Sequence, residues 1–395
     1  MAAQPSRDLS SGTFRHAMRV LFFGPYPLPG QPISGGVMAV VQALARGLAE
    51  RTGFQVGVAS VHPGLSPAVE QEDALTIYRI PVPRLRRLRL QLPLRQALVA
   101  AAHDFAPDII HAHGTGYAAA AALDSRYPSV ITVHGVIRNE AVLSGARGFK
   151  ERLAWQYDAL FEWLVLRRAR DCVAISPYIR RVFARHHHIR WTDIENPVDE
   201  ACFALVRQPE PGLLLCPARV IPRKGIDVLI RAFADVASVH PQAHLFVAGE
   251  TETNPDYVAH CRDLAARLGV NARISLAGGL PRSRFLEALS RATCVVLPAR
   301  QETAPVAVAE ALAAGCPVVA SAVGGVPDMI ESERNGLLVP PDAPPALAAA
   351  LNRILSLPPA TAASMSAAAR ASARRYRLDV ILRKTVSLYE NLLAA

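Results

Sequence analysis

Short apolar runs alternate with amphipathic stretches along the whole chain, a pattern typical of parallel strands wrapped in helices. In the first half, the runs that predict strands cover residues 18–24, 54–61, 107–113, 129–135 and 171–176. The stretches that predict helices cover residues 37–51, 94–105 and 150–170. We therefore expect the first half to form an α/β domain with a doubly wound, mainly parallel sheet.

The second half restarts the same alternation. Its apolar runs, which predict a second set of strands, cover residues 212–218, 243–249, 272–278, 293–299 and 316–321. Between the two series, residues 195–212 contain three prolines and show no clear period, which predicts a linker. The sequence thus predicts two Rossmann-like doubly wound domains, at 1–205 and 206–375. A final helix at 376–395 either caps the second domain or crosses back to the first.

The composition agrees with a large globular protein. Of 395 residues, 51% are hydrophobic and 19% charged, which excludes disordered, collagen-like and coiled-coil chains. The net charge of +10 favours an anionic partner: nucleic acid, acidic lipid or a phosphorylated small molecule. No nucleic-acid partner is expected, because the basic residues are dispersed, few aromatics interleave with them and no nucleic-acid-binding motif is present.

The sequence predicts no targeting or membrane-spanning segment. The N-terminus is polar and lacks an apolar signal core. The longest charge-free apolar run, 311–327, is broken by glycines and prolines. The six cysteines show no C-x-x-C spacing, which favours buried, reduced thiols. We expect a cytoplasmic protein, with peripheral contact at the inner face of a membrane as an open alternative.

The most informative stretch is 299–330, which begins at the carboxyl end of a predicted strand. Ligands bind at such strand ends in open α/β sheets. Thr303 is placed to cap the following helix and Pro305 suits its first position, so free N–H groups at Ala304 to Val306 would form an anion site. Two carboxylates, Glu302 and Glu310, flank that helix start. Their placement suits a ligand with hydroxyls on both sides of a phosphate, as in a sugar nucleotide.

A second cluster follows the strand that ends near residue 218. Arg219 and Lys224 are two cations five residues apart, and Gly225 then opens a predicted helix. Two such cations at a strand end can neutralise a diphosphate. An exposed loop with incidental basic residues is the alternative for this pair taken alone.

Together these residues resemble a known family. The stretch ETAPVAVAE, from Glu302 to Glu310, resembles the E-x7-E signature of retaining glycosyltransferase family 4, also called glycosyl transferases group 1. RVIPRKG (219–225) resembles its basic donor loop, and SGGV (34–37), DIIHAHG (108–114) and TVHG (132–135) continue the likeness. The resemblance covers the chain from about Met18 to the last helix. It implies the GT-B fold, in which two Rossmann-like domains face each other across a cleft.

The resemblance also implies roles for individual residues. Glu302 would contact hydroxyls of the donor sugar and Glu310 the ribose. Arg219 and Lys224 would hold the diphosphate, together with the backbone from Thr303 through Val306. The backbone at Gly35 and Gly36 would approach the phosphates. The donor sugar would lie near His134, and the base near Gly249 and Leu280. The donor would be a nucleoside-diphosphate sugar and the acceptor, held by the first domain, a glycan, glycolipid or small molecule.

The chain departs from the family pattern at three places. The sequence after Glu302 is Thr-Ala-Pro, and Pro305 removes one N–H group from the phosphate-facing turn. Asn196-Pro197-Val198-Asp199 stands at the domain junction where relatives have Asn-Gly-Val-Asp. Gly249-Glu250-Thr251 stands in a region that touches the base in relatives, so the base is left open. Family members need no metal or other cofactor, and no D-x-D motif is present here.

Other interpretations compete with these. His111 and His113 could chelate a metal, but packing is favoured because no third ligand is nearby. Residues 186–188 could do so too, but a solvated helix end is favoured because they end an arginine-rich helical stretch. A sugar-nucleotide epimerase, a phosphorylase, or an inactive membrane-associated subunit could use the same fold. A nicotinamide-dependent dehydrogenase is disfavoured, since no G-x-G-x-x-G follows the first strand. Residues 84–95, rich in arginine and leucine, and residues 147–170 could lie on an anionic membrane.

Overall fold

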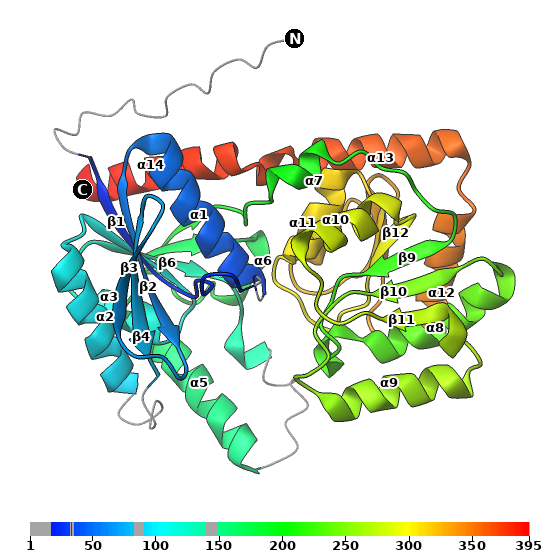
Figure 1. The fold of residues 1–395 in the computed structure, drawn as a ribbon, viewed down its shortest axis with the longest axis horizontal. Coiled ribbons are helices and arrows are strands. Elements are labelled where there is room, and N and C mark those ends of the chain that lie inside the picture. The colour runs from blue at the N-terminus through cyan, green and yellow to red at the C-terminus, as the bar shows by residue number, and fades with distance from the viewer. Residues whose placement is uncertain (1–16, 32, 34, 83–90, 140–148, 395) are drawn as a thin grey trace, which may run out of the picture.

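The computed structural model describes residues 17–31, 33, 35–82, 91–139 and 149–394, and it contains two α/β units side by side (Figure 1). The first unit is built on an eight-stranded sheet and the second on a six-stranded sheet. The expected pair of doubly wound sheets is therefore confirmed.

The first sheet has the strand order β3-β4-β2-β1-β5-β6-β7-β8, and all its strands are parallel except β3. Its strands are β1 (Arg19–Phe23), β2 (Gln55–His62), β3 (Ala68–Glu72), β4 (Leu75–Pro81), β5 (Ile109–His113), β6 (Ser129–Val133), β7 (Asp171–Ala174) and β8 (Arg190–Asp193). The apolar runs did not predict β3 or β8, because both are edge strands with exposed or half-exposed, mostly polar residues. The apolar β4 was also missed.

The second sheet has the order β11-β10-β9-β12-β13-β14 and is wholly parallel. Its strands are β9 (Leu213–Cys216), β10 (His244–Val247), β11 (Ile274–Leu276), β12 (Cys294–Leu297), β13 (Val318–Ser321) and β14 (Gly336–Val339). The chain adds β10 and β11 on one side of β9 and then β12, β13 and β14 on the other, so the order of strands reverses between β9 and β12. Ligands bind beside such a reversal, at the carboxyl ends of the strands.

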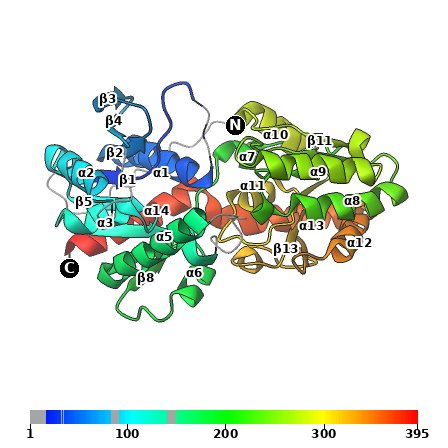
Figure 2. The same ribbon diagram turned by 90° about the horizontal axis from the view of Figure 1, so that it is seen from below.

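Helices cover both faces of each sheet and bury apolar cores against them (Figure 2). In the first unit they are α1 (Gly36–Thr52), α2 (Leu92–Phe105), α3 (Tyr117–Asp124), α5 (Phe149–Arg168) and α6 (Pro177–Val182). In the second they are α8 (Ile226–Val239), α9 (Pro255–Arg267), α10 (Arg282–Arg291), α11 (Val306–Ala314), α12 (Pro344–Leu355) and α13 (Pro359–Ala373).

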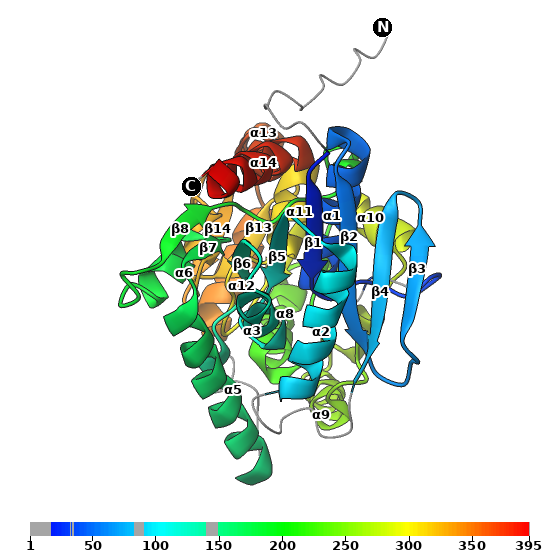
Figure 3. The ribbon, with the colours of Figure 1, turned by 90° about the vertical axis from the view of Figure 1, so that its left-hand side faces the viewer.

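The last helix, α14 (Leu378–Ala394), crosses back to the first unit, as Figures 1 and 3 show. Ile381, Leu382 and Tyr389 are buried in the core beneath α1, where Leu382 lies against Gly47. The chain passes between the units twice, once near Val198 and once near Tyr376. The two passages lie side by side, because the Val198 N–H donates to the Tyr376 carbonyl at 2.9 Å. The alternative in which this helix only caps the second unit is therefore excluded.

The linker is more ordered than its sequence predicts. It contains the short helix α7 (Glu200–Ala204), whose first turn is capped by the Asp199 carboxylate accepting from the Ala201 N–H at 2.9 Å. All six cysteines are buried and unpaired. Among the described helices, none is long and apolar enough to cross a membrane.

Candidate active site

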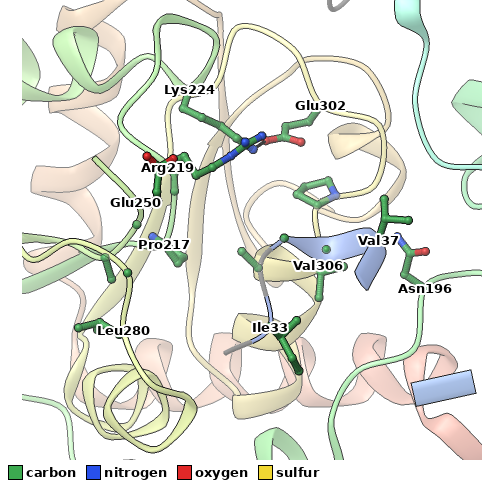
Figure 4. Close-up of a pocket in the computed structure, with 18 of the residues that line it drawn as sticks. Ile33, Val37, Asn196, Pro217, Arg219, Lys224, Glu250, Leu280, Glu302 and Val306 are labelled. Carbon is green, nitrogen blue, oxygen red and sulfur yellow. Dashed lines mark hydrogen bonds and ion pairs between the residues drawn. The ribbon is translucent and has the colours of Figure 1, made fainter. Parts of the chain in front are cut away.

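A cavity of about 1170 Å³ lies between the two units and is lined by both (Figure 4). Loops at the carboxyl ends of β1 and β6 line it from the first unit, and those after β9, β10, β11 and β12 from the second. Every residue that the sequence predicts for the site lines this cavity, with the exception of Glu310. The strand-end argument thus predicts that these residues share one cavity.

The second unit contributes a group of cations to one wall of the cleft. Arg219 follows β9 and is exposed, and among the described residues no ion pair is found for it. Lys224 ends a 3-10 turn (Pro222–Lys224) and forms an ion pair with Glu302. Arg223, which the sequence analysis did not single out, donates to the Gln301 side chain at 3.0 Å. Figure 4 shows Arg219, Lys224 and Glu302 grouped on one side of the cavity.

Glu302 is buried in the loop after β12, at 6% exposure. Its ion pair with Lys224 supplies the positive partner that a buried carboxylate needs. The Lys224 loop can approach β12 because Gly225 has φ +65°, and a Cβ there would lie 2.1 Å from the Pro298 carbonyl oxygen. The lysine and the carboxylate are therefore held together by backbone packing as well as by charge.

Gly324 and Gly325 hold the same loop from the other side, and the sequence analysis missed their role. A Cβ on Gly324, which has φ +55°, would lie 1.6 Å from the Glu302 carbonyl oxygen. A Cβ on Gly325 would lie 1.9 Å from that of Thr303. The Gly-Gly pair after β13 was a visible signal, because adjacent glycines after a strand mark a place where two backbones meet closely.

Two helix N-termini meet at the cavity, one from each unit. α1 begins at Gly36 after Gly35 with φ +89°, and α11 begins at Val306. A Cβ on Gly36 would lie 3.4 Å from the Val306 side chain, so the two helix starts are in contact. Their first N–H groups have no acceptor within their own helices and both ends carry partial positive charge. The cavity is therefore suited to an anion.

The prediction that Thr303 caps α11 is wrong. Pro305 is the N-cap residue and no side chain caps this helix, so Pro305 lies one position earlier than expected. Thr303 is turned into the interface, where its carbonyl accepts from the Ser176 hydroxyl at 3.1 Å. The uncapped N–H groups at the start of α11 are thereby left for a ligand.

Glu310 lies behind Arg282 and does not line the cavity. Arg282 Nη1 is 2.6 Å from the Glu310 carboxylate, and its Nε is 3.1 Å from that of Asp199. Burial raises the pKa of Glu310, while the Arg282 guanidinium opposes that rise. Arg282, the first residue of α10, lines the cavity in its place. No local pattern marked it, because the two residues are 28 positions apart.

The residues expected near the base also line the cavity. Gly249 pairs with Gly278 in an isolated bridge, and a Cβ on Gly249 would lie 2.0 Å from the Ala218 carbonyl oxygen. Leu280, half-buried after β11, lies beside it on the cavity wall. Glu250 accepts from the Thr253 hydroxyl at 2.6 Å on the same rim.

His134 is the side chain that the end of β6 contributes to the cleft. Its Nε2 lies 2.8 Å from Nδ1 of His113, and burial lowers the pKa of His134 to about 4. The imidazole is therefore neutral at physiological pH. His111 and His113 are buried in a stack of rings beneath it, in agreement with the packing interpretation.

Two doubly wound units, a cationic cleft between their strand ends and a C-terminal helix that crosses back make up the architecture of the GT-B fold. Residues 34–201 match the family model Glycosyltransferase Family 4, and residues 198–372 match Glycosyl transferases group 1. The two models together span residues 34–372, and the chain belongs to this type of glycosyltransferase, family 4.

Relatives and solved structures agree with this assignment. D-inositol 3-phosphate glycosyltransferase 1 of Catenulispora acidiphila is 29% identical, over 83% of this chain and 84% of its own. The fold is similar to that of sucrose-phosphate synthase from Thermosynechococcus elongatus, with a TM-score of 0.80, 22% identity and 95% and 99% of the two chains covered. Anabaena HepE in complex with UDP-glucose has a TM-score of 0.73 at 20% identity, covering 94% and 99%.

Proposed function

We propose that this glycosyltransferase moves a sugar from a nucleoside-diphosphate sugar to a hydroxyl of an acceptor, with retention of anomeric configuration. The observation that carries the donor class is the convergence of Arg219, Lys224 and two helix N-termini on one cavity. A diphosphate fits those groups. HepE, a protein of similar fold, is described in complex with UDP-glucose, which supports the same donor class.

The chemistry we propose is stabilisation of the leaving group. Negative charge grows on the diphosphate as the bond from the sugar carbon to the phosphate oxygen breaks. Lys224, held by its ion pair with Glu302, and the N–H groups at the start of α11 are fixed before the reaction, so they can stabilise that charge with little reorganisation. Arg219 adds a further positive charge. Glu302 accepts hydrogen bonds from sugar hydroxyls, a role that comes from the family resemblance. Retention rests on the same resemblance.

The experiment is incubation with UDP-, GDP-, ADP- and dTDP-sugars, each with and without a panel of acceptors. Acceptor-dependent release of one nucleoside diphosphate is the expected result, and NMR of the first product should show the donor's anomeric configuration. Conversion of the donor without acceptor would indicate an epimerase, and a requirement for inorganic phosphate a phosphorylase. Donor binding without turnover would indicate an inactive subunit.

We further propose that transfer requires no metal ion or cofactor. Arg219, Lys224 and the two helix starts line the cavity. They can neutralise the negative charge of the diphosphate that a bridging metal would otherwise neutralise. Turnover should be unchanged after treatment with a chelator. A loss of activity that added Mg²⁺ or Mn²⁺ restores would contradict this part of the proposal.

For the acceptor side we propose contact with an anionic membrane through α5. Leu153, Leu160 and Trp163 are 55%, 55% and 45% exposed on this helix, and their spacing places them along one stripe. The exposed residues between 152 and 168 are Arg152, Leu153, Gln156, Leu160, Trp163, Arg167 and Arg168. None is acidic, so an apolar stripe flanked by arginines faces solvent, as on helices that lie at lipid surfaces.

The position of α5 agrees with such a contact. Figures 1 and 3 show the helix projecting from the side opposite α13 and α14. Arg167 stacks on the Trp163 ring at 4.7 Å, so the charge and the aromatic ring are presented together. The arginine–leucine residues 84–90, which suggested a membrane from the sequence, lie outside the described residues, and Arg95 pairs with Asp124.

Co-sedimentation with phosphatidylglycerol-containing vesicles tests this contact without any assay of activity. Replacing Leu153, Leu160 and Trp163 by glutamine should abolish binding. The matched control replaces Val206, Val239 and Leu268, exposed apolar residues outside α5, and should bind normally. Equal behaviour of the two variants, or no binding of the wild type at low salt, would contradict the contact.

A further inference from the structure

Three histidine rings form a stack at the floor of the cleft, and the lower two are buried. His111 and His113 lie on β5, and His134 directly follows the neighbouring strand β6. Ring centroids are 4.5 Å apart between His111 and His113, and 5.0 Å apart between His113 and His134. His134 lines the cavity, whereas His113 is 5% exposed and reaches it only through His134. The family resemblance gave no role to His113.

One hydrogen bond joins the last two rings, between Nδ1 of His113 and Nε2 of His134 at 2.8 Å. Burial lowers the pKa of both histidines, so both rings are neutral at physiological pH. A neutral imidazole has one nitrogen that donates and one that accepts. The direction of this single bond therefore determines which nitrogen of each ring carries the proton.

The far nitrogen of His113 decides that direction. Its Nε2 is buried and has no hydrogen-bond partner among the described residues. If His113 accepted at Nδ1, its proton would have to lie on Nε2, as a buried N–H without an acceptor. Orphaned buried N–H groups are rarer than under-satisfied acceptors. His113 therefore donates from Nδ1, and His134 accepts at Nε2 and carries its own proton on Nδ1.

A second pair of contacts keeps the stack in place. His111 Nδ1 lies 2.6 Å from the Tyr389 hydroxyl of α14, and its Nε2 lies 2.6 Å from the Thr132 hydroxyl of β6. Both hydroxyls can donate or accept, so His111 is satisfied in either tautomer. Because His113 is stacked between His111 and His134, its ring has little freedom to turn away from His134.

We propose that His113 is a positioning residue that fixes His134 as its Nδ1–H tautomer, so that His134 offers the cleft a hydrogen-bond donor. Nε2 of His134 is engaged by His113, which leaves Nδ1–H for a ligand oxygen. A sugar hydroxyl or a diphosphate oxygen has the matching acceptor. The identity of that oxygen rests on the proposed function, whereas the tautomer does not.

The tautomer is tested on the free protein by NMR of ¹⁵N-labelled histidines. Long-range ¹H–¹⁵N correlations distinguish Nδ1–H from Nε2–H imidazoles, and the signals that disappear in His134→Asn assign the residue. An Nδ1–H ring at neutral pH is the expected result. An Nε2–H ring or an imidazolium would overturn the proposal, whether or not sugar transfer is ever observed.

The role of His113 is tested by two amide substitutions. Asparagine can place its N–H donor near the position of Nδ1, whereas glutamine places it near Nε2. We expect His113→Asn to keep most of the turnover, and His113→Gln to lose about tenfold in kcat, because an aligned donor is lost in the transition state. Nucleoside diphosphate affinity should be unchanged in both variants when the ligand oxygen is a sugar hydroxyl, and should fall in His113→Gln when it is a diphosphate oxygen.

Equal turnover in the two variants would overturn the positioning role, since packing alone would then account for His113. Thermal unfolding of both variants shows whether each is folded. If glutamine prevents folding, the NMR measurement on the wild-type protein still decides the proposal.

Discussion

The two walls of the cleft are built from different kinds of residue. The second unit supplies charge: Arg219, Lys224 and Glu302 all lie at strand ends of one sheet. From the first unit come a glycine turn, the apolar Ile33 and a neutral His134. Under the proposed function, the cations of the charged wall face the diphosphate, whereas the apolar and neutral groups of the other wall suit uncharged parts of the donor and the acceptor.

The walls also differ in how they are held. The loops of the charged wall pack on other loops of their own sheet, as Gly225 does on Pro298 and Gly324 on Glu302. The loop after β1 in the other wall is held by Arg79, which is 1% exposed and donates to the Pro27 carbonyl at 2.9 Å. The first kind of contact is backbone packing at glycines and the second is made by a buried side chain, so we expect substitutions in the two walls to act differently.

The largest effect is expected at the centre of the charged wall. Glu302→Gln keeps the shape of the side chain but removes the charge that pairs with Lys224. We expect kcat to fall by at least about 100-fold, while calorimetry still detects nucleoside diphosphate binding. Glu210→Gln, at an exposed pair with Arg291, serves as control. Unchanged turnover of Glu302→Gln would remove this residue from the site.

A backbone change behind the same loop should have the next largest effect. In Gly324→Ala the new Cβ collides with the Glu302 carbonyl, and φ +55° disfavours alanine. Displacing Glu302 by about 1 Å should cost roughly 10- to 100-fold in turnover, with a lower Tm. Gly279→Ala is the matched control, because Gly279 lines the cavity and a Cβ there meets nothing within 4 Å. Similar losses in both variants would contradict the packing argument.

Acid should lower the folding stability of the protein through the buried histidine behind the neutral wall. Burial lowers the pKa of His111 to about 3, so the unfolded chain binds this proton at higher pH than the folded one. His111 therefore contributes stability that is present above its unfolded pKa and is lost as the pH falls. Between pH 7 and pH 5 the loss should be about 2 kcal/mol.

Denaturant unfolding at several pH values measures that loss. His111→Phe should be less stable than the wild type at pH 7, because it loses the contacts with Tyr389 and Thr132. Its stability should nevertheless depend less on pH across the same interval. An equal pH dependence in the two proteins would show that His111 does not titrate in this way.

The smallest effect is expected at the rim of the neutral wall. Ile33 is 47% exposed, so Ile33→Ser should change Tm by no more than about 1 °C, as is usual for surface positions. If this wall binds the acceptor, the KM for the acceptor should rise, and the affinity for the nucleoside diphosphate should not change. A loss of nucleotide affinity would mean that the rim at Ile33 contacts the donor.

Arg219, Lys224 and Glu302 of the charged wall could be predicted from the sequence because they lie in loops that follow apolar strands. Arg219, Lys224 and Glu302 meet since β9 and β12 are neighbours in the sheet. Gly35 and Gly36 were found for the same reason, after β1. The paired sheets themselves follow from the alternation of apolar runs, which left out the polar edge strands β3 and β8 and the apolar strands β4 and β14.

Long-range pairings could not be predicted. Arg282 covers Glu310 from 28 residues away, and Tyr389 reaches His111 across 278 residues. The bond between His113 and His134 depends on the register of β5 against β6, which no local pattern fixes. The absence of a side-chain cap on α11 likewise depends on Thr303 turning toward Ser176 of the other unit.

The central claim is that the charged wall binds the diphosphate of the donor, and calorimetric titration tests it most directly. UDP, GDP, ADP and dTDP, with their nucleosides, would be titrated into the wild type and into Arg219→Ala. We predict that one diphosphate binds, and that Arg219→Ala weakens it by about tenfold, the scale of one charge-assisted contact, while its nucleoside is little affected. Equal weakening of nucleoside and diphosphate, or no binding by any of them, would contradict the account.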